Sequence, residues 1–393
     1  MKFRRLKDAK LKGKTALVRV DFNLPRDKQG NITDDTRLKA ALPTINYLRE
    51  KGAKTVLLSH YGRPKGKPNP DMSLRFVISP LVEALGHPVM FSEPLNEAVT
   101  SVMENGDIVL IENTRFAEGE EKGSEDMAKY LAAHGDIFVM DAFSAAHRNH
   151  ATSAVIGKHL PAYAGLAMER EIDHISQALE HPKKPVMAIV GGAKVSTKID
   201  LLKNLVSRLD KLVIGGGMAN TFLFALGHKV GASLCEKDLK DTALEIMANA
   251  KKAKCEIILP VDVVVATEFK AGAESRVCGL DGVKSKEMIL DAGPETVSKI
   301  LDAIEASKTL IWNGPLGAFE LTPFDTSTVE CAKFAAKHCK DGKIIAVAGG
   351  GDTVAALNQA GASDDFTFIS TAGGAFLEWM EGKALPGVEI LKL

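Results

Sequence analysis

Clusters of glycine recur in the second half of this 393-residue chain, each directly after an apolar run. The four segments are IVGGAKVSTK at 189–198, VIGGGMANTF at 213–222, VAGGGDTVAAL at 347–357 and ISTAGGAF at 369–376. Glycine costs backbone entropy, but it lets the backbone approach a ligand closely. The N–H groups at the start of a following helix favour anions. Four such loops together predict a site for phosphate or a nucleotide, although a single glycine pair is often only a tight turn.

Two lysines follow the first cluster. Lys194 and Lys198 stand four residues apart, just after Gly191 and Gly192. If a helix begins near Ala193, both ammonium groups lie on one face and can meet adjacent phosphates. The alternative is that both are solvated surface lysines, the commonest state of this residue.

An acid follows the third cluster. Asp352 comes directly after Gly350 and Gly351 and directly before Thr353. Phosphate chains reach proteins as magnesium complexes, and Mg²⁺ typically takes only one or two carboxylates from the protein. Asp352 is therefore a candidate magnesium ligand. It is equally suited to cap a helix over 353–359, and both roles fit the spacing.

The two commonest nucleotide-binding motifs are absent. The chain contains no G-x-x-x-x-G-K-[ST], which excludes a P-loop nucleoside triphosphatase. No G-x-G-x-x-G follows the first predicted strand, which argues against a nicotinamide-dependent oxidoreductase on two dinucleotide-binding domains, the competing class of enzyme.

The first half carries spaced cations beside polar loops instead of glycine triplets. Asp21 and Asn23 lie in RVDFNLP at 19–25, at a predicted strand end. The cations that follow strands or begin a helix are Arg37, His60, Arg63, Arg115 and Arg148. Arginine is suited to bidentate capture of phosphate or carboxylate, whereas a single arginine in a loop is usually solvated.

Charge is unevenly distributed along the chain. The formal net charge is zero, but residues 1–100 hold 19 Lys and Arg against 10 Asp and Glu. A small anionic ligand in the first half fits this excess, and so does a solvated basic face. The zero net charge gives no general attraction to nucleic acid or to an anionic membrane. His147 and His150, together with Asp141, could suggest a metal site. The two histidines are only three residues apart and no second cluster of ligands accompanies them, so we do not expect zinc.

Short apolar runs alternate with helical patterns along the whole chain, which predicts parallel sheets built from βαβ units. The expected strands of the first half are 15–22, 54–60, 107–113 and 136–143. Those of the second half are 185–192, 211–217, 256–265, 308–314, 343–351 and 366–374. A helix is expected over 36–52, ending at Gly52, and a connecting helix over 166–185. We expect an α/β protein with two doubly wound lobes, a helix and hinge between them, and a cleft.

Length and composition support two domains in the cytoplasm. A chain of 393 residues exceeds the roughly 250–300 at which single cores stop growing. The five cysteines form no C-x-x-C pair and indicate reduced thiols. MKFRRLKDAK at the N-terminus has no apolar segment behind it, so we expect no secretory signal. No apolar stretch approaches the length of a membrane-spanning helix.

Seven segments in order give the chain a resemblance to phosphoglycerate kinases from about residue 3 to the end. They are RVDFNLP, SHYGRP, DAFSAAHR, GGAKVSTK, GGGMANTF, WNGPLGAFE and VAGGGDT. The resemblance implies reversible phosphoryl transfer from 1,3-bisphosphoglycerate to Mg·ADP, giving 3-phosphoglycerate and ATP in glycolysis. It implies a monomer whose two lobes close about a hinge. A nucleotide-binding scaffold without turnover is the alternative of the same fold.

The resemblance also implies a role for each lobe. Residues 1–170, with 379–393 returning to them, would bind phosphoglycerate, and 171–378 would bind Mg·nucleotide. The phosphoglycerate residues would be Asp21, Asn23, Arg37, His60, Arg63, Arg115 and Arg148. The nucleotide residues would be Gly192, Lys198, Glu320 (toward the ribose), Gly350, Gly351, Asp352 (with Mg²⁺) and Thr353. Arg37, Lys194 and Lys198 would be catalytic, with Arg37 and Lys194 on the transferred phosphoryl group.

Four positions depart from the family's usual pattern, and TPFDTST at 322–328 lacks a glycine often found near the hinge segment. Ser144-Ala145 stands where Gly-Thr is common, which removes a threonine hydroxyl near the substrate. Ala372 replaces a glycine and Phe376 replaces a small residue. None of these is among the expected ligand-binding residues, so the expected reaction is unchanged.

Overall fold

A computed structural model describes all residues from Met1 to Leu393, and the chain divides into two compact units. The N-terminal unit comprises Met1–Asp173 together with Ala384–Leu393, and the C-terminal unit comprises His174–Lys383. The first boundary falls inside helix α6 (Leu166–Leu179). The helix itself ends before Pro182, as its sequence pattern predicts. No helix has both the length and the hydropathy needed to cross a bilayer.

The N-terminal unit contains a six-stranded, fully parallel sheet in the order β3-β4-β2-β1-β5-β6. Its strands are β1 (Thr15–Arg19), β2 (Lys54–Leu58), β3 (Met90–Ser92), β4 (Ile108–Ile111), β5 (Ile137–Met140) and β6 (Ala162–Ala164). The residues of β4 and β5 are all buried, because helices cover both faces of a parallel sheet. The three-residue strands β3 and β6 are too short to give a sequence signal.

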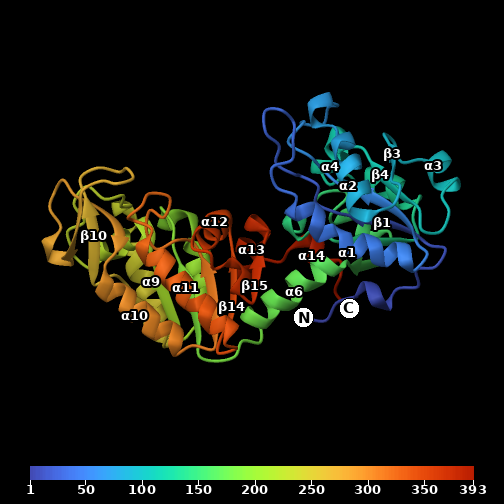
Figure 1. Cartoon of the computed structure of the whole chain (residues 1–393). Helices are drawn as coiled ribbons and strands as arrows, with labels where there is room; N and C mark the ends of the chain where they lie inside the picture. The colour runs from blue at the N-terminus through green and yellow to red at the C-terminus, as the bar shows by residue number, and fades with distance from the viewer. The chain divides into compact units, whose positions relative to one another are not determined.

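Helices and 3₁₀ turns connect these strands (Figure 1). The α-helices are α1 (Thr36–Glu50), α2 (Ile78–Leu85), α3 (Glu97–Ser101), α4 (Glu118–Glu121), α5 (Glu125–Ala132) and α14 (Pro386–Glu389). The 3₁₀ turns are η1 (Leu6–Asp8), η2 (Pro70–Met72), η3 (Leu74–Val77), η4 (Thr114–Phe116), η5 (Phe143–Ala145) and η6 (Val155–Lys158). After α1 the chain turns at Gly52, whose φ of 73° is the left-handed conformation expected after a helix.

The C-terminal unit repeats the architecture with the order β15-β14-β13-β7-β8-β9, again fully parallel. The strands are β7 (Val186–Val190), β8 (Lys211–Ile214), β9 (Glu256–Ile258), β13 (Thr309–Asn313), β14 (Ile345–Gly349) and β15 (Phe368–Ser370). Two parallel six-stranded sheets with intervening helices confirm the predicted α/β class.

A small antiparallel sheet in this unit corrects one predicted strand. The run 256–265 is not one strand: β9 ends at Ile258, and β10 (Asp262–Ala266) begins a separate sheet in the order β11-β10-β12. Pro260 lies between them and cannot donate to a strand ladder. The other two strands are β11 (Ser275–Gly279) and β12 (Met288–Ala292). Figure 1 shows β10 and β15 at opposite ends of the unit.

The helices of the C-terminal unit follow its strands. They are α7 (Ile199–Leu205), α8 (Gly216–Ala225), α9 (Lys240–Ala253), α10 (Pro294–Glu305), α11 (Thr326–Lys340), α12 (Gly351–Gln359) and α13 (Gly373–Met380). The 3₁₀ turns are η7 (Val195–Thr197), η8 (Lys237–Leu239), η9 (Leu280–Gly282) and η10 (Ser363–Asp365). Trp312 of β13 is buried in the core between sheet and helices, and its indole donates to Gly314 O at 2.9 Å.

Truncation of a central strand tests this core. We expect Ile189→Ala in β7, where the side chain is fully buried, to lower the free energy of unfolding of the C-terminal unit by about 2–5 kcal/mol. The matched control is Leu226→Ala at the end of α8, where the side chain is 47% exposed; it should change that value by roughly 0.5 kcal/mol or less. Denaturant unfolding measures both, and equal effects would contradict the described core.

Candidate functional site

Three of the four glycine clusters meet at cavities in the C-terminal unit. The first cavity, about 310 Å³, lies at the carboxyl ends of β7, β13 and β14. Its walls include seven of the predicted residues, namely Gly192, Lys194, Lys198, Gly350, Gly351, Asp352 and Thr353. The fourth cluster instead begins α13, and Leu377 of that helix is its nearest contribution to the wall.

Asn313, at the end of β13, holds this cavity together. Its amide nitrogen donates to Gly349 O at 2.7 Å, and its backbone oxygen accepts from Gly191 N at 2.9 Å. Its side-chain oxygen accepts from Lys198 Nζ at 2.6 Å. Lys198 Nζ also donates to Gly191 O at 2.5 Å and to Asn313 O at 3.2 Å. The backbone and side chain of Asn313 together thus connect the loops after β7 and β14 to the partly buried lysine.

Lys198 has an unusual electrostatic environment. Burial lowers the pKa of its ammonium group to about 8, and the charge of Asp352 opposes this only in part. The three acceptors around Nζ are neutral amide oxygens. A ligand with negative charge would therefore stabilise the charged lysine.

The local backbone differs from the sequence-based prediction after the first glycine cluster, and the third cluster leaves Asp352 in another role than that of a helix cap. No regular helix begins near Ala193: the 3₁₀ turn η7 follows Lys194, and α7 starts only after Lys198. Lys194 is exposed in extended backbone, so the two lysines do not share a helix face. Asp352 is not a helix cap either, since α12 is capped by Gly350 with φ of 101°. The exposed carboxylate of Asp352 is left available at the cavity.

Glycine is required where these loops meet. A Cβ on Gly191 would lie 1.8 Å from Pro315 O, so no side chain fits between the ends of β7 and β13. Phe376 packs beneath Gly349, where a Cβ would lie 2.5 Å from its ring. The departure at Phe376 therefore fills space under the glycine triplet instead of entering the cavity.

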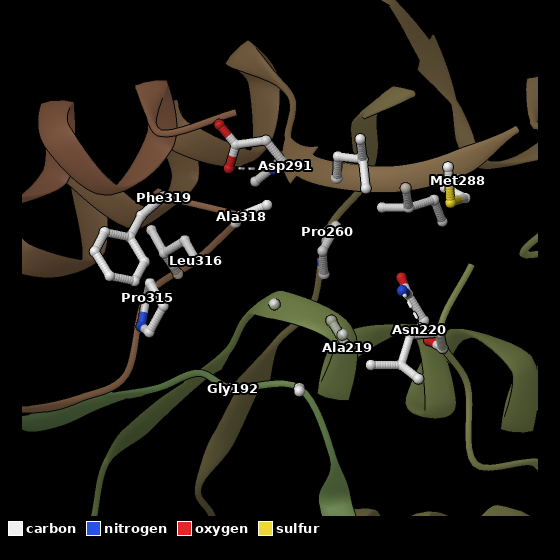
Figure 2. A pocket seen from close by; sticks show the side chains of 18 of the residues that line it. Gly192, Ala219, Asn220, Pro260, Met288, Asp291, Pro315, Leu316, Ala318 and Phe319 are labelled. Carbon is white, nitrogen blue, oxygen red and sulfur yellow. Dashed lines mark hydrogen bonds between the residues drawn. The ribbon is translucent and has the colours of Figure 1, made fainter. Parts of the chain in front are cut away.

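A second cavity of about 450 Å³ adjoins the first and shares Gly192, Ala193, Pro315 and Asp352 with it. Its surroundings are mainly apolar: Figure 2 shows Pro315, Leu316 and Phe319 on one side and Met288 on the other. Glu320 also lines this cavity. A polar pocket joined to an apolar chamber matches the chemistry of a nucleotide, whose phosphates and base need different surroundings.

Asp291 fixes the wall of the second cavity. Its carboxylate accepts from Ser327 N at 3.0 Å, from the Ser327 hydroxyl and from Ala292 N at 2.9 Å. Burial raises the pKa of this carboxyl to about 7. A Cβ on Gly317 would lie 2.1 Å from Asp291 Oδ1, so the carboxylate packs directly against the loop after β13.

A cluster of cations lies at the carboxyl ends of strands in the N-terminal unit. Arg19, at the end of β1, is 1% exposed, and its Nη2 donates to His60 Nδ1 at 2.9 Å. A guanidinium can only donate, so His60 Nδ1 accepts and the ring proton is on Nε2. Burial, together with the charges of Arg19, Arg115, Arg148 and Arg37, lowers the pKa of His60 well below its ordinary value. His60 is therefore a neutral donor within a positive field.

Arg37, Asp21 and Asn23 form one connected group. Arg37 Nη1 lies 3.2 Å from Asp21 Oδ2 and donates to Asn23 O at 3.0 Å. The side chain of Asn23 accepts from Gly62 N at 3.0 Å. Ser144 donates from Oγ to Asp21 Oδ2 at 2.5 Å, so this departure from the family pattern still brings a hydroxyl to the cluster.

Arg115 is joined to the same loops through Asn113. Asn113 Oδ1 accepts from Tyr61 N at 3.2 Å and from Arg115 N at 3.1 Å. Arg115 Nη1 donates to Gly62 O at 2.6 Å, and its Nε lies 3.2 Å from a Glu121 oxygen.

Arg148 precedes a turn whose later residues bond to buried Glu120. Arg148 Nε donates to His147 Nε2 at 3.2 Å. Glu120 is fully buried and accepts from Thr152 N at 3.0 Å and from Thr152 Oγ1 at 2.6 Å. Burial and the neighbouring arginines lower the pKa of His150 to about 4, so this histidine adds no charge at neutral pH.

Six of the seven predicted phosphoglycerate residues thus belong to one cluster; Arg63 is exposed and makes no ion pair or hydrogen bond. No group of three His, Cys, Asp or Glu side chains is placed to hold a metal ion by itself. Sequence reasoning missed Arg19, Asn113, Glu120 and Asn313. The only signal was position, since Arg19, Asn113 and Asn313 end or directly follow apolar runs.

The comparisons decide the family. A family model described as phosphoglycerate kinase matches residues 6–383. This chain belongs to the phosphoglycerate kinase family. A phosphoglycerate kinase of Caulobacter vibrioides (strain NA1000 / CB15N) is 61% identical over 100% of both chains. One of Maricaulis maris (strain MCS10) is 61% identical over 98% of this chain and 96% of the relative.

A solved structure of phosphoglycerate kinase from Coxiella burnetii superposes with a TM-score of 0.94 at 41% identity, covering 99% of this chain and 98% of that one. The fold class and the resemblance carried by the seven segments are confirmed. The chain is an enzyme of the phosphoglycerate kinase family, a phosphotransferase, and the oxidoreductase alternative is excluded.

The neutrality of His60 can be measured directly. Below pH 6.5 a histidine in the unfolded chain takes up a proton, whereas His60 in the folded protein does not, so acidification through this range should reduce stability. ¹⁵N NMR of the imidazole, with His60→Gln to assign the signal, should show a neutral ring protonated at Nε2 from pH 8 down to below 6. Titration near 6.5 would contradict the described environment.

The pKa of Lys198 is a second measurable property. ¹³C-methylated lysines followed by NMR should include one signal that titrates near 8 and is lost in Lys198→Arg. An ordinary lysine titrates at about 10.4. Saturation with Mg·ADP should raise this pKa if phosphates approach Nζ, because negative charge favours the ammonium form. A Lys198 signal that titrates with the other lysines would contradict the desolvated site.

Proposed function

We propose that the chain catalyses reversible phosphoryl transfer from 1,3-bisphosphoglycerate to Mg·ADP, giving 3-phosphoglycerate and ATP. The observation that carries the proposal is the pairing of two kinds of anion site in one chain of this family. One is the glycine-walled cavity with Lys198 and its apolar neighbour; the other is the arginine cluster around neutral His60.

The nucleotide would bind in the C-terminal unit. Its phosphates would lie against Lys198, Gly192, Gly350, Gly351 and Thr353, with the base in the apolar cavity and the ribose toward Glu320. Asp352 is the only carboxylate that lines the 310 Å³ cavity, which suits a Mg²⁺ ion that takes most of its other ligands from phosphate and water. When bound, Mg²⁺ would neutralise phosphate charge and orient the polyphosphate.

Phosphoglycerate would bind in the N-terminal unit. Arg37, Arg115, Arg148 and exposed Arg63 would hold its phosphate and carboxylate, with Asp21 and Asn23 orienting its hydroxyl and neighbouring groups. His60, neutral and protonated at Nε2, would donate a hydrogen bond and transfer no proton. The 3-phosphoglycerate carboxylate is already ionised at pH 7, so the reaction needs no general base.

Catalysis would consist of positioning and charge neutralisation. Lys194 is free of ion pairs and exposed at the cavity, so its ammonium group could follow the transferred phosphoryl group together with Arg37. We propose that the two units close about a hinge during turnover, because water would otherwise accept the phosphoryl group.

Kinetics of matched variants test this proposal. Arg37→Ala and Lys194→Ala should each reduce kcat with 3-phosphoglycerate and Mg·ATP by about 10²–10³, because each removes a donor to transition-state charge. Lys39→Ala, two residues along α1, and Lys203→Ala in α7 are exposed cations outside both sites and should leave kcat unchanged.

The control outcomes separate the alternatives. An inactive parent protein that still binds Mg·ADP would contradict the kinase and support the nucleotide-binding scaffold. Turnover that survives both Arg37→Ala and Lys194→Ala would retain the reaction and reject these two residues.

A further inference from the structure

Lys194, which the proposed reaction places on the transferred phosphoryl group, lies in a segment with little regular structure of its own. The residue is exposed and its backbone is extended, with φ of −136° and ψ of 134°. It directly precedes the three-residue turn η7, and its side chain caps none of the N–H groups there. A lysine side chain can only donate, so these N–H groups need an acceptor from another segment. The position of Lys194 therefore depends on contacts made by its neighbours.

One such contact lies two residues before Lys194. Met218 N, in the first turn of α8, donates to Gly192 O at 3.0 Å. A Cβ on Gly217 would lie 2.6 Å from Ala193 O, so the start of α8 packs directly on this backbone. Helix α8 thus fixes the chain that leads into Lys194.

A second contact lies two residues after Lys194 and comes from Glu236. The Glu236 carboxylate accepts from Ser196 N at 3.0 Å and from the Ser196 hydroxyl at 2.5 Å, which supplies the acceptor that the turn lacks. Burial alone would raise the pKa of this carboxyl. The bonds from Ser196 and Val195 outweigh burial and, with the charge of Lys194, hold this pKa below its ordinary value. Glu236 is therefore an ionised acceptor at neutral pH, and hydrogen bonds to a charged group are the stronger ones.

Glu236 is itself fixed to α8. Its N–H donates to Thr221 Oγ1 at 3.0 Å, and the carbonyl of Leu234 accepts from Asn220 Nδ2 at 3.1 Å. Thr221 and Asn220 are each only 1% exposed. The contacts before and after Lys194 therefore both originate on one helix. Glu236 lines neither of the two cavities of this unit, so it is not placed to contact the nucleotide itself.

We propose that Glu236 is a positioning residue for Lys194. By bonding to Ser196 it ties the backbone after Lys194 to α8, so that the exposed ammonium group extends toward the transferred phosphoryl group from a fixed backbone position. This inference rests on the role proposed for Lys194 in the reaction.

Steady-state kinetics of the full chain test whether Glu236 acts through Lys194. Glu236→Ala should lower kcat with 3-phosphoglycerate and Mg·ATP by about tenfold, because a small misplacement of a reacting group slows catalysis. The KM of each substrate should change by less than about twofold, since the contact serves the transition state. In the Lys194→Ala background, Glu236→Ala should cause no further loss of kcat, because its effect passes through Lys194.

Two further variants are matched to Glu236→Ala. Glu236→Gln should keep kcat within about threefold of the parent value, because its amide can accept from Ser196 N and donate to the Ser196 hydroxyl. Glu245→Ala removes another partly exposed carboxylate of this unit. Glu245 lies on α9 and accepts from Lys203 Nζ of α7 at 3.1 Å instead of bonding to the turn, so this variant should keep the parent kcat.

Hydrogen exchange of the Ser196 amide, followed by NMR, tests the contact independently of activity. Exchange should be about tenfold faster in Glu236→Ala and unchanged in Glu245→Ala. Thermal unfolding verifies that each variant is folded. An inactive parent would contradict the proposed reaction and the kinetic role of Glu236 with it. With an active parent, the inference about Glu236 alone is overturned by unchanged Ser196 exchange in Glu236→Ala, by a further loss of kcat in the Lys194→Ala background, or by a Glu236→Gln variant as impaired as Glu236→Ala.

Discussion

In each unit, one buried asparagine beside the carboxyl end of a strand holds together the loops that carry the cations. The side chain of Asn313 bonds to Gly349 and Lys198, while its backbone oxygen accepts from Gly191 N, and the side chain of Asn113 bonds to Tyr61, Met72 and Arg115. An amide has two donors and two acceptor positions, so it can join loops from neighbouring parallel strands that cannot bond to one another directly. Parallel strands bring these loops to one edge of the sheet, and the asparagine then fixes their spacing. Among the cations, Lys198 and Arg115 are bonded directly to these two asparagines.

The functional consequence of these fixed loops is that positive charge and hydrogen-bond donors are held in place. Arg19 is fully buried and the pKa of its guanidinium is lowered, chiefly by burial. His60 likewise has a lowered pKa, because burial and the neighbouring arginines disfavour its charged form, and burial lowers the pKa of Lys198 against the opposing charge of Asp352. The folded protein thus holds donors in place before a ligand arrives, and an anion relieves the repulsion among them. Donors that need no reorganisation stabilise transition-state charge more effectively than flexible ones, which suits a reaction that requires no acid or base.

Much of the fold could be predicted from the sequence, because most strands are continuous apolar runs and the glycine clusters follow them. The four central strands of the N-terminal sheet, the six strands of the C-terminal parallel sheet and the position of α1 followed from periodicity, whereas the three-residue strands β3 and β6 did not. The antiparallel sheet did not, because β11 alternates in burial and contributes no apolar run, while β9 and β10 read as one strand across Pro260. The candidate site residues were predicted only because the segments that contain them resemble those of a family. Asn313 and Asn113 were missed because their importance lies in bonds to distant loops, such as Asn313 to Gly349, which no local pattern encodes.

We propose that the nucleotide binds in the C-terminal unit and phosphoglycerate in the N-terminal unit, and the most direct test is a crystal structure with Mg·ADP and 3-phosphoglycerate together. The predicted result places ADP phosphates against Lys198 and the glycines of the 310 Å³ cavity, and 3-phosphoglycerate among Arg37, His60 and Arg115. Density for either ligand elsewhere, or for both in one unit, would contradict the central claim that the two cation clusters are separate, preformed anion sites.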